Sequence, residues 1–216
     1  MRRGLFFIHR FEPGTDAGSP PLLLLHGTGG NEADLIPLGR MVAPNSALLS
    51  PRGKVLEGGM PRFFRRLAEG IFDEADVRQR ALELADFIGE AREAYRVAAP
   101  LALGYSNGAN IAAAVLLLRP DVLAGAILLR AMVTLSHEPQ PNLSGKPVLI
   151  VSGASDPIIP AMNAGRLASM LKQAGAAVEH RTLPVGHELS QADVSVARAW
   201  LEKNEALATE SPGSAA

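Results

Sequence analysis

The sequence predicts an α/β domain whose sheet is mostly parallel and is covered by helices on both faces. Short apolar runs alternate with segments of helical periodicity, which is the pattern of strands joined by crossover helices. The chain has 216 residues, 47% of them hydrophobic, enough to bury one large core. No linker or repeat interrupts the pattern. We therefore expect a single domain over residues 1–204 and a disordered tail, rich in small polar residues, over 205–216.

Seven short apolar segments are predicted to be the strands of the sheet. Each is bounded by turn-forming residues or by a helical pattern. The predicted strands are Leu5–Phe11, Pro21–Leu25, Ala47–Ser50, Leu101–Tyr105, Gly125–Leu129, Val148–Ser152 and Ala177–Leu183.

Helices are predicted between these strands from periodicity and from end signals. Apolar residues recur at spacings of four and three from Val77 to Tyr95, one stripe of a long amphipathic helix. Asn31 and Asp34 resemble a capping box that opens a helix through residue 42. Pro160 near its start and Gly175 past its end bracket another helix.

Composition excludes several classes of function. The net charge is -1 and the 21 Lys and Arg residues are scattered along the sequence. The sequence therefore does not predict a basic surface that would bind nucleic acid. The chain has no cysteine, which excludes a thiol nucleophile, a disulfide and a thiolate metal site. The apolar runs Leu5–Ile8 and Ile111–Leu118 are too short for a signal peptide core or a membrane span. We expect a cytoplasmic protein without stable membrane association, and either a monomer or a homodimer.

The most informative stretch is Gly104-Tyr105-Ser106-Asn107-Gly108, which lies between a predicted strand and a helical run. In a GxSxG nucleophile elbow the chain turns so sharply at the serine that the residues two before and two after must be small. Both are glycine here. The context therefore predicts that Ser106 is a nucleophile.

A serine hydroxyl needs a histidine to take its proton and an acid to orient that histidine. In elbow folds the chain order is serine, acid, histidine, each on a loop after a strand. Asp156 follows the predicted strand Val148–Ser152, and His187 follows Ala177–Leu183. We predict a triad of Ser106, Asp156 and His187.

The other candidates have weaker positions. His9 and His180 lie on predicted strands, and His137 with Glu138 lies on a loop typical of a solvated surface. An acid directly after Leu129 is ruled out, because Arg130-Ala131-Met132 stands there.

The loop His26-Gly27-Thr28-Gly29-Gly30 follows the strand Pro21–Leu25, where one oxyanion-hole amide is expected. We predict the backbone amides of Thr28 and Asn107 as the two donors, with His26 holding the loop. The competing interpretation, a phosphate cradle, lacks both the GxxxxGK[ST] and the GxGxxG pattern.

The motifs LLLLHGTGGNE, SPRG, GYSNGAN, SGASDPIIP and GHELS together resemble the phospholipase/carboxylesterase branch of the α/β-hydrolases, over about Leu22 to Leu201. The resemblance implies an α/β-hydrolase fold and the same triad and oxyanion residues. Acyl-protein thioesterases of this branch usually carry Gln after the serine. Asn107 therefore favours the small bacterial carboxylesterases.

The function expected is a serine carboxylesterase acting on small or medium acyl esters, without cofactor or metal. Fewer than twenty residues separate Leu129 from Val148, too few for a cap domain. Phe63, Phe64 and Met132 are the predicted pocket wall, and nearby arginines are either an attractant for acidic substrates or a solvated surface. Alternatives are a thioesterase or lysophospholipase, a perhydrolase, and a catalytically silent binding module.

Overall fold

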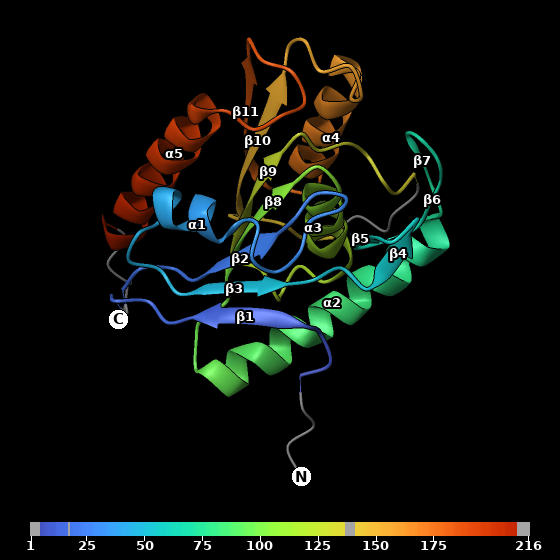
Figure 1. The fold of residues 1–216 in the computed structure, drawn as a ribbon. Coiled ribbons are helices and arrows are strands. Elements are labelled where there is room, and N and C mark those ends of the chain that lie inside the picture. The colour runs from blue at the N-terminus through green and yellow to red at the C-terminus, as the bar shows by residue number, and fades with distance from the viewer. Residues whose placement is uncertain (1–4, 17, 137–140, 211–216) are drawn as a thin grey trace.

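The computed structural model describes residues 5–16, 18–136 and 141–210. Its centre is a seven-stranded sheet in the order β1-β3-β2-β8-β9-β10-β11 (Figure 1). β1 pairs antiparallel with β3, and every other pair in this sheet is parallel. The strands are β1 (His9–Glu12), β2 (Leu22–Leu25), β3 (Leu48–Pro51), β8 (Leu101–Tyr105), β9 (Gly125–Leu129), β10 (Pro147–Gly153) and β11 (Ala177–Leu183).

All seven predicted strands are therefore present, the first starting at His9 instead of Leu5. The order of the strands decides where the loops meet. β8 lies between β2 and β9, so the loops that follow these three strands emerge side by side at the carboxyl edge of the sheet. In open α/β sheets this edge is where ligands bind.

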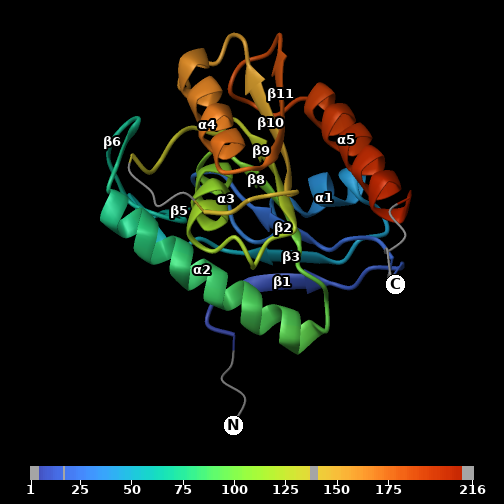
Figure 2. The same cartoon turned by 180° about the vertical axis from the view of Figure 1, so that it is seen from behind.

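Helices cover both faces of the sheet (Figure 1, Figure 2). α1 (Ile36–Val42) and α5 (Gln191–Glu210) lie on one face, and α2 (Glu74–Tyr95), α3 (Asn107–Leu118) and α4 (Ala161–Gln173) lie on the other. Each face has its own apolar core, and β2 contributes to both because its side chains alternate between the two faces. The sequence Leu22–Leu25 is fully buried for this reason.

The predicted start of one helix was wrong. α1 begins at Ile36 instead of Asn31, although Asn31 accepts a hydrogen bond from Ala33 and its own amide donates to Asp34. Proline fits only the first turn of a helix, so Pro37 sets the start of α1. Towards the end of the chain, α5 continues to Glu210, into the segment expected to be a tail. Alanine, leucine and glutamate at 205–210 favour that continuation.

Two small hairpins between β3 and α2 were not predicted. β4 (Val55–Glu57) pairs with β5 (Met60–Arg62), and β6 (Arg66–Ala68) pairs with β7 (Ile71–Phe72). The first turn consists of Gly58 and Gly59, both with positive φ, which is the signature of a two-residue hairpin loop. The Gly58-Gly59 pair in the sequence could therefore have been used to predict the hairpin of β4 and β5.

Within the described ranges, none of the helices combines the length and the apolar character that crossing a bilayer requires.

Candidate active site

Ser106 stands at the turn from β8 into α3. Its φ is 52° and its ψ is -113°, a backbone conformation that a non-glycine residue rarely adopts. The two glycines allow this turn. A Cβ on Gly104 would lie 2.6 Å from the carbonyl oxygen of Gly108, and a Cβ on Gly108 would lie 1.9 Å from that of Leu25. The elbow is therefore possible only with glycine at both positions.

Ser106, His187 and Asp156 form a continuous line of contacts. Nε2 of His187 lies 3.0 Å from Oγ of Ser106, and Nδ1 lies 2.8 Å from Oδ2 of Asp156. The other carboxylate oxygen accepts the amides of Ile158, at 2.8 Å, and Ile159, at 3.0 Å. The three side chains come from loops after β8, β10 and β11, as the sequence predicted.

The environment of Asp156 favours its ionised form. Burial alone raises the pKa of this carboxyl, but the hydrogen bonds from His187, Ile159 and Ile158 together outweigh burial and bring the pKa below its usual value. An ionised acid beside Nδ1 holds the proton on that nitrogen. Nε2 is then left free to accept a proton from Ser106.

Arg130 holds the loop that carries His187, a role that sequence reasoning missed. Nε donates to the carbonyl of Gly186 at 2.9 Å, and Nη2 donates to that of Glu188 at 3.1 Å, the residues on either side of His187. A two-pronged ion pair to Asp193, at 2.7 and 3.0 Å, fixes the guanidinium in turn. Both side chains of the pair are 0% exposed. Tyr105 adds a hydrogen bond to the carbonyl of His187 at 3.2 Å.

Thr28 and Asn107, the predicted oxyanion donors, line the same cavity as Ser106. Among the described residues, no acceptor is found for the backbone amide of Thr28 or of Asn107. Asn107 is also the first residue of α3, where helix geometry leaves the amide without an intrahelical partner. His26 holds the Thr28 loop: its Nδ1 donates to Gly27 at 2.6 Å, and its Nε2 accepts the amide of Gly53 at 2.9 Å.

The end of β5 ties these two loops together. Nη1 of Arg62 donates to Oγ1 of Thr28 at 2.8 Å, and the amide of Phe63 donates to Oδ1 of Asn107 at 2.7 Å. The amide of Gly29 donates to the carbonyl of Pro61 at 2.9 Å. Residues 61–63 thus set the spacing between the Thr28 loop and the start of α3.

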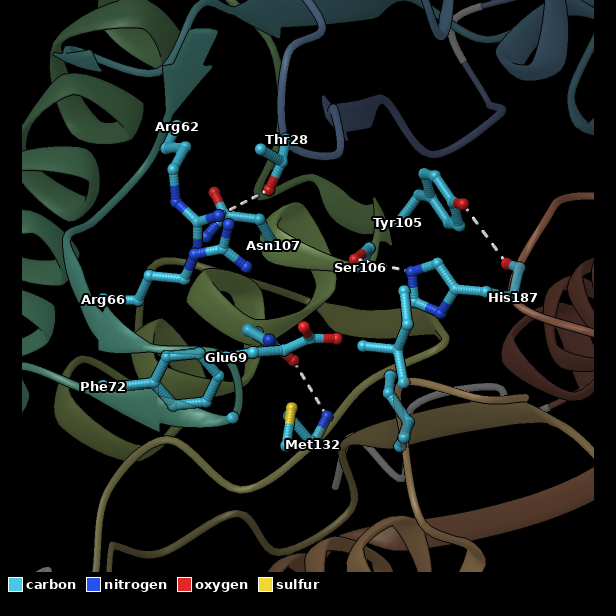
Figure 3. A pocket seen from close by; sticks show the side chains of 14 residues that line it. Thr28, Arg62, Arg66, Glu69, Phe72, Tyr105, Ser106, Asn107, Met132 and His187 are labelled. Carbon is cyan, nitrogen blue, oxygen red and sulfur yellow. Dashed lines mark hydrogen bonds between the residues drawn. The ribbon is translucent and has the colours of Figure 1, made fainter. Parts of the chain in front are cut away.

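A cavity of about 380 Å³ surrounds Ser106 (Figure 3). Met132, one of the residues expected to line a pocket, lies in its lining, and its position is fixed by a hydrogen bond from its amide to Asn110 at 2.8 Å. Phe63 and Phe64 are not among its lining residues, because they are 3% and 0% exposed within the core. Phe72 lines the wall instead, with Phe64 packed edge-on behind it. The remaining lining residues are Thr28, Arg62, Arg66, Glu69, Gly70, Tyr105, Asn107, Asn110, Ile158, Ile159 and His187.

The other histidines lie elsewhere. His9 contacts Tyr95 at 2.7 Å, and His180 contacts Ser152 at 2.9 Å. His137 and Glu138 lie outside the described residues. Within the described ranges, no group of three or more His, Cys, Asp or Glu side chains is arranged to hold a metal ion.

Comparison with known proteins agrees with this geometry. A family model described as phospholipase/carboxylesterase matches residues 9–205. The putative hydrolase MhqD of Bacillus subtilis (strain 168) is 46% identical over 197 residues, which cover 90% of this chain and 98% of MhqD.

Two solved structures are similar over most of their length. The Bacillus cereus carboxylesterase is 46% identical with a TM-score of 0.90, and the match covers 93% of this chain and 95% of that protein. The carboxylesterase of Mesorhizobium loti is 33% identical with a TM-score of 0.83, covering 87% and 90%. The chain is thus an α/β-hydrolase and belongs to the phospholipase/carboxylesterase family.

Proposed function

We propose that the protein is a serine carboxylesterase that hydrolyses small to medium acyl esters through an acyl-enzyme intermediate. The observation that carries the proposal is the continuous contact from Asp156 through His187 to Ser106 on a strained elbow. Carboxylesterases at 46% and 33% identity support the choice of ester substrates.

In the first half of the reaction, Oγ of Ser106 attacks the ester carbonyl carbon while Nε2 of His187 takes the hydroxyl proton. The carbonyl oxygen becomes negative and accepts hydrogen bonds from the amides of Thr28 and Asn107. Asp156 stabilises the positive imidazole. The bond to the leaving oxygen then breaks, and His187 returns the proton to it, releasing an alcohol and leaving the acyl group on Ser106.

In the second half, His187 takes a proton from a water molecule, whose oxygen attacks the acyl carbon. The same two amides stabilise the second oxyanion. When the bond to Oγ breaks, the proton on Nε2 passes to Ser106. The carboxylic acid leaves and the free enzyme is restored.

Covalent labelling tests this assignment. An alkyl phosphonate with a good leaving group should add once to the wild-type chain, at Ser106, as read by intact-mass spectrometry and peptide mapping. Ser106→Ala should abolish both the labelling and the hydrolysis of 4-nitrophenyl butyrate. Ser155→Ala is the matched control, since Ser155 is an exposed serine beside the triad acid.

The acid is tested separately. Asp156→Asn should lower kcat by about 10⁴-fold, because an amide stabilises the wrong imidazole tautomer. A loss of less than about tenfold in Asp156→Asn would show that another group orients His187.

In the labelling experiment, full labelling of Ser106→Ala would show that another residue is the nucleophile.

A further inference from the structure

Two arginines line the cavity and share a single carboxylate. Nε of Arg62 lies 3.3 Å from Oε2 of Glu57, and Nη2 of Arg66 lies 2.7 Å from Oε1 of the same side chain. Arginine keeps its charge at any ordinary pH. The group of three therefore carries one positive charge in excess, at the wall of the cavity that contains Ser106.

This charge is held in a fixed place. The Arg62 side chain is 3% exposed, and it also donates to Thr28 and to the carbonyl of Phe64, at 2.8 and 3.2 Å. A cation so far removed from water interacts more strongly with a nearby anion than an exposed one does. Figure 3 draws Arg62, Arg66 and Asn107 on the same side of Ser106.

Several hydrogen-bond donors of the residues on this wall have no partner. Among the described residues, neither Nη2 of Arg62 nor Nη1 of Arg66 has a hydrogen-bond partner. Nδ2 of Asn107, a residue that also lines the cavity, has no partner either, and of these three donors it is the buried one. Buried donors are nearly always paired in folded proteins. A wall of unpaired donors with a net positive charge suits a ligand that brings negatively charged oxygen.

We propose that Arg62 and Arg66 form a subsite for a carboxylate, so that the preferred ester substrates carry a free carboxylate on the part that enters this side of the cavity, as in a monoester of a small dicarboxylic acid. The inference rests on the proposed function, because it places the subsite next to the reacting serine. One carboxylate balances the single excess charge, and its two oxygens can each take a donor from a different guanidinium.

Glu69 works against this preference and so provides a second test. It lines the same cavity but is exposed on the turn between β6 and β7, where water screens its charge. Its negative charge repels a substrate carboxylate weakly. Removing that charge should strengthen the preference, in the direction opposite to the loss of Arg66.

The experiment compares two esters of equal length, monomethyl glutarate and methyl pentanoate, which differ by a carboxylate in place of a methyl group. The measured quantity is the ratio of their kcat/KM values, followed by methanol release. Arg66→Gln should lower this ratio about tenfold, the effect expected for one charge-assisted hydrogen bond. Glu69→Gln should raise it. Arg65→Gln is the matched control, because Arg65 is exposed, pairs with Asp73 and does not line the cavity.

Calorimetric titration with glutarate, pentanamide and inorganic phosphate adds a readout that needs no turnover. Glutarate should bind wild-type protein more tightly than phosphate or than pentanamide, which has no carboxylate, and Arg66→Gln should remove the difference. If glutarate binds in this way but neither ester is hydrolysed, the proposed function fails and the subsite stands. An equal change of the ratio in Arg65→Gln and Arg66→Gln, or tighter binding of phosphate than of glutarate, would overturn the subsite.

Discussion

At the scale of single residues, the protonation state of His26 decides whether its ring can hold the Thr28 loop. The carbonyl of Gly27 can only accept, so Nδ1 carries the hydrogen, while Nε2 must be unprotonated to accept the amide of Gly53. A second proton, on Nε2, would point at the amide hydrogen of Gly53 and break that hydrogen bond. Burial also favours the neutral ring: it lowers the pKa of His26, although the hydrogen bond to Gly27 acts to raise it.

The sign of the pH effect on stability follows. Below a pH of about 6.5, an unfolded histidine binds a proton that the folded His26 refuses, so acid favours unfolding. The free energy of unfolding should fall between pH 7.5 and 5, with a slope of up to about 1.4 kcal/mol per pH unit from this residue. Urea unfolding at pH 7.5 and at pH 5 measures this fall in the free energy of unfolding. His26→Gln should reduce the fall, since glutamine both donates and accepts without titrating; an unchanged fall would assign the effect elsewhere, for example to His180, whose pKa burial also lowers.

The contacts among Ser106, His187 and Asp156 could be anticipated at this scale because a local signal marks each of the three residues. The glycines mark the elbow, and a loop after a predicted strand marks both Asp156 and His187. The role of Arg130 was not predictable. Its partners Gly186, Glu188 and Asp193 lie far along the chain, and no local pattern brings them to it.

At the scale of elements, the ion pair of Arg130 and Asp193 joins the end of β9 to the start of α5 and to the loop carrying His187. Replacing one partner leaves the other as a buried, unpaired charge, which costs about 3–5 kcal/mol. Arg130→Met should therefore lower the free energy of unfolding by about that amount, and should lower kcat because His187 loses the support on both sides.

The double variant separates the two effects. In Arg130→Met/Asp193→Leu no buried charge is left alone, so much of the stability should return, as measured by urea unfolding. The loss of kcat should persist, because the carbonyls of Gly186 and Glu188 still lack a donor. Recovery of kcat together with stability would mean that the pair supports the fold and does not position His187.

The hairpins show why pocket residues are harder to predict than the triad. Phe63 and Phe64 are predicted as wall residues because they follow the SPRG motif, in a segment that lies near the active site in the family that the sequence resembles. In the structure both point into the core, and Phe72 on β7 forms the wall. Which side of a short strand faces the cavity depends on the register of the hairpin, and the sequence of β6 and β7 does not fix that register.

At the scale of the whole molecule, the strand order was the part of the fold that the sequence left open. Apolar runs locate strands but do not say which ones pair. The placement of β2 and β9 on either side of β8 is what brings Thr28 and Met132 to Ser106. Among the described residues between β9 and β10 there is no further helix or strand. The cavity walls come from short loops and hairpins, together with the end of β8 and the start of α3.

These short walls limit how much of an acyl chain can be buried. The apolar part of the lining consists of Phe72, Met132, Ile158 and Ile159. Each additional buried methylene should contribute about 0.8 kcal/mol until this wall ends, and nothing after it. For 4-nitrophenyl esters we therefore expect kcat/KM to rise up to medium chains, about C4 to C8, and then to level off or fall.

The same architecture predicts no jump in rate at the micellar threshold, because such a jump requires a covering element that moves aside. Phe72→Ala should flatten the rise with chain length and affect acetate hydrolysis little, since acetate does not reach the ring. Ile71→Ala is the matched control, being an exposed neighbour outside the cavity. A steady increase through C16 would require a long covered tunnel, and a jump at the micelle boundary would require a lid. Either result would contradict a cavity whose walls are loops, hairpins and the ends of β8 and α3.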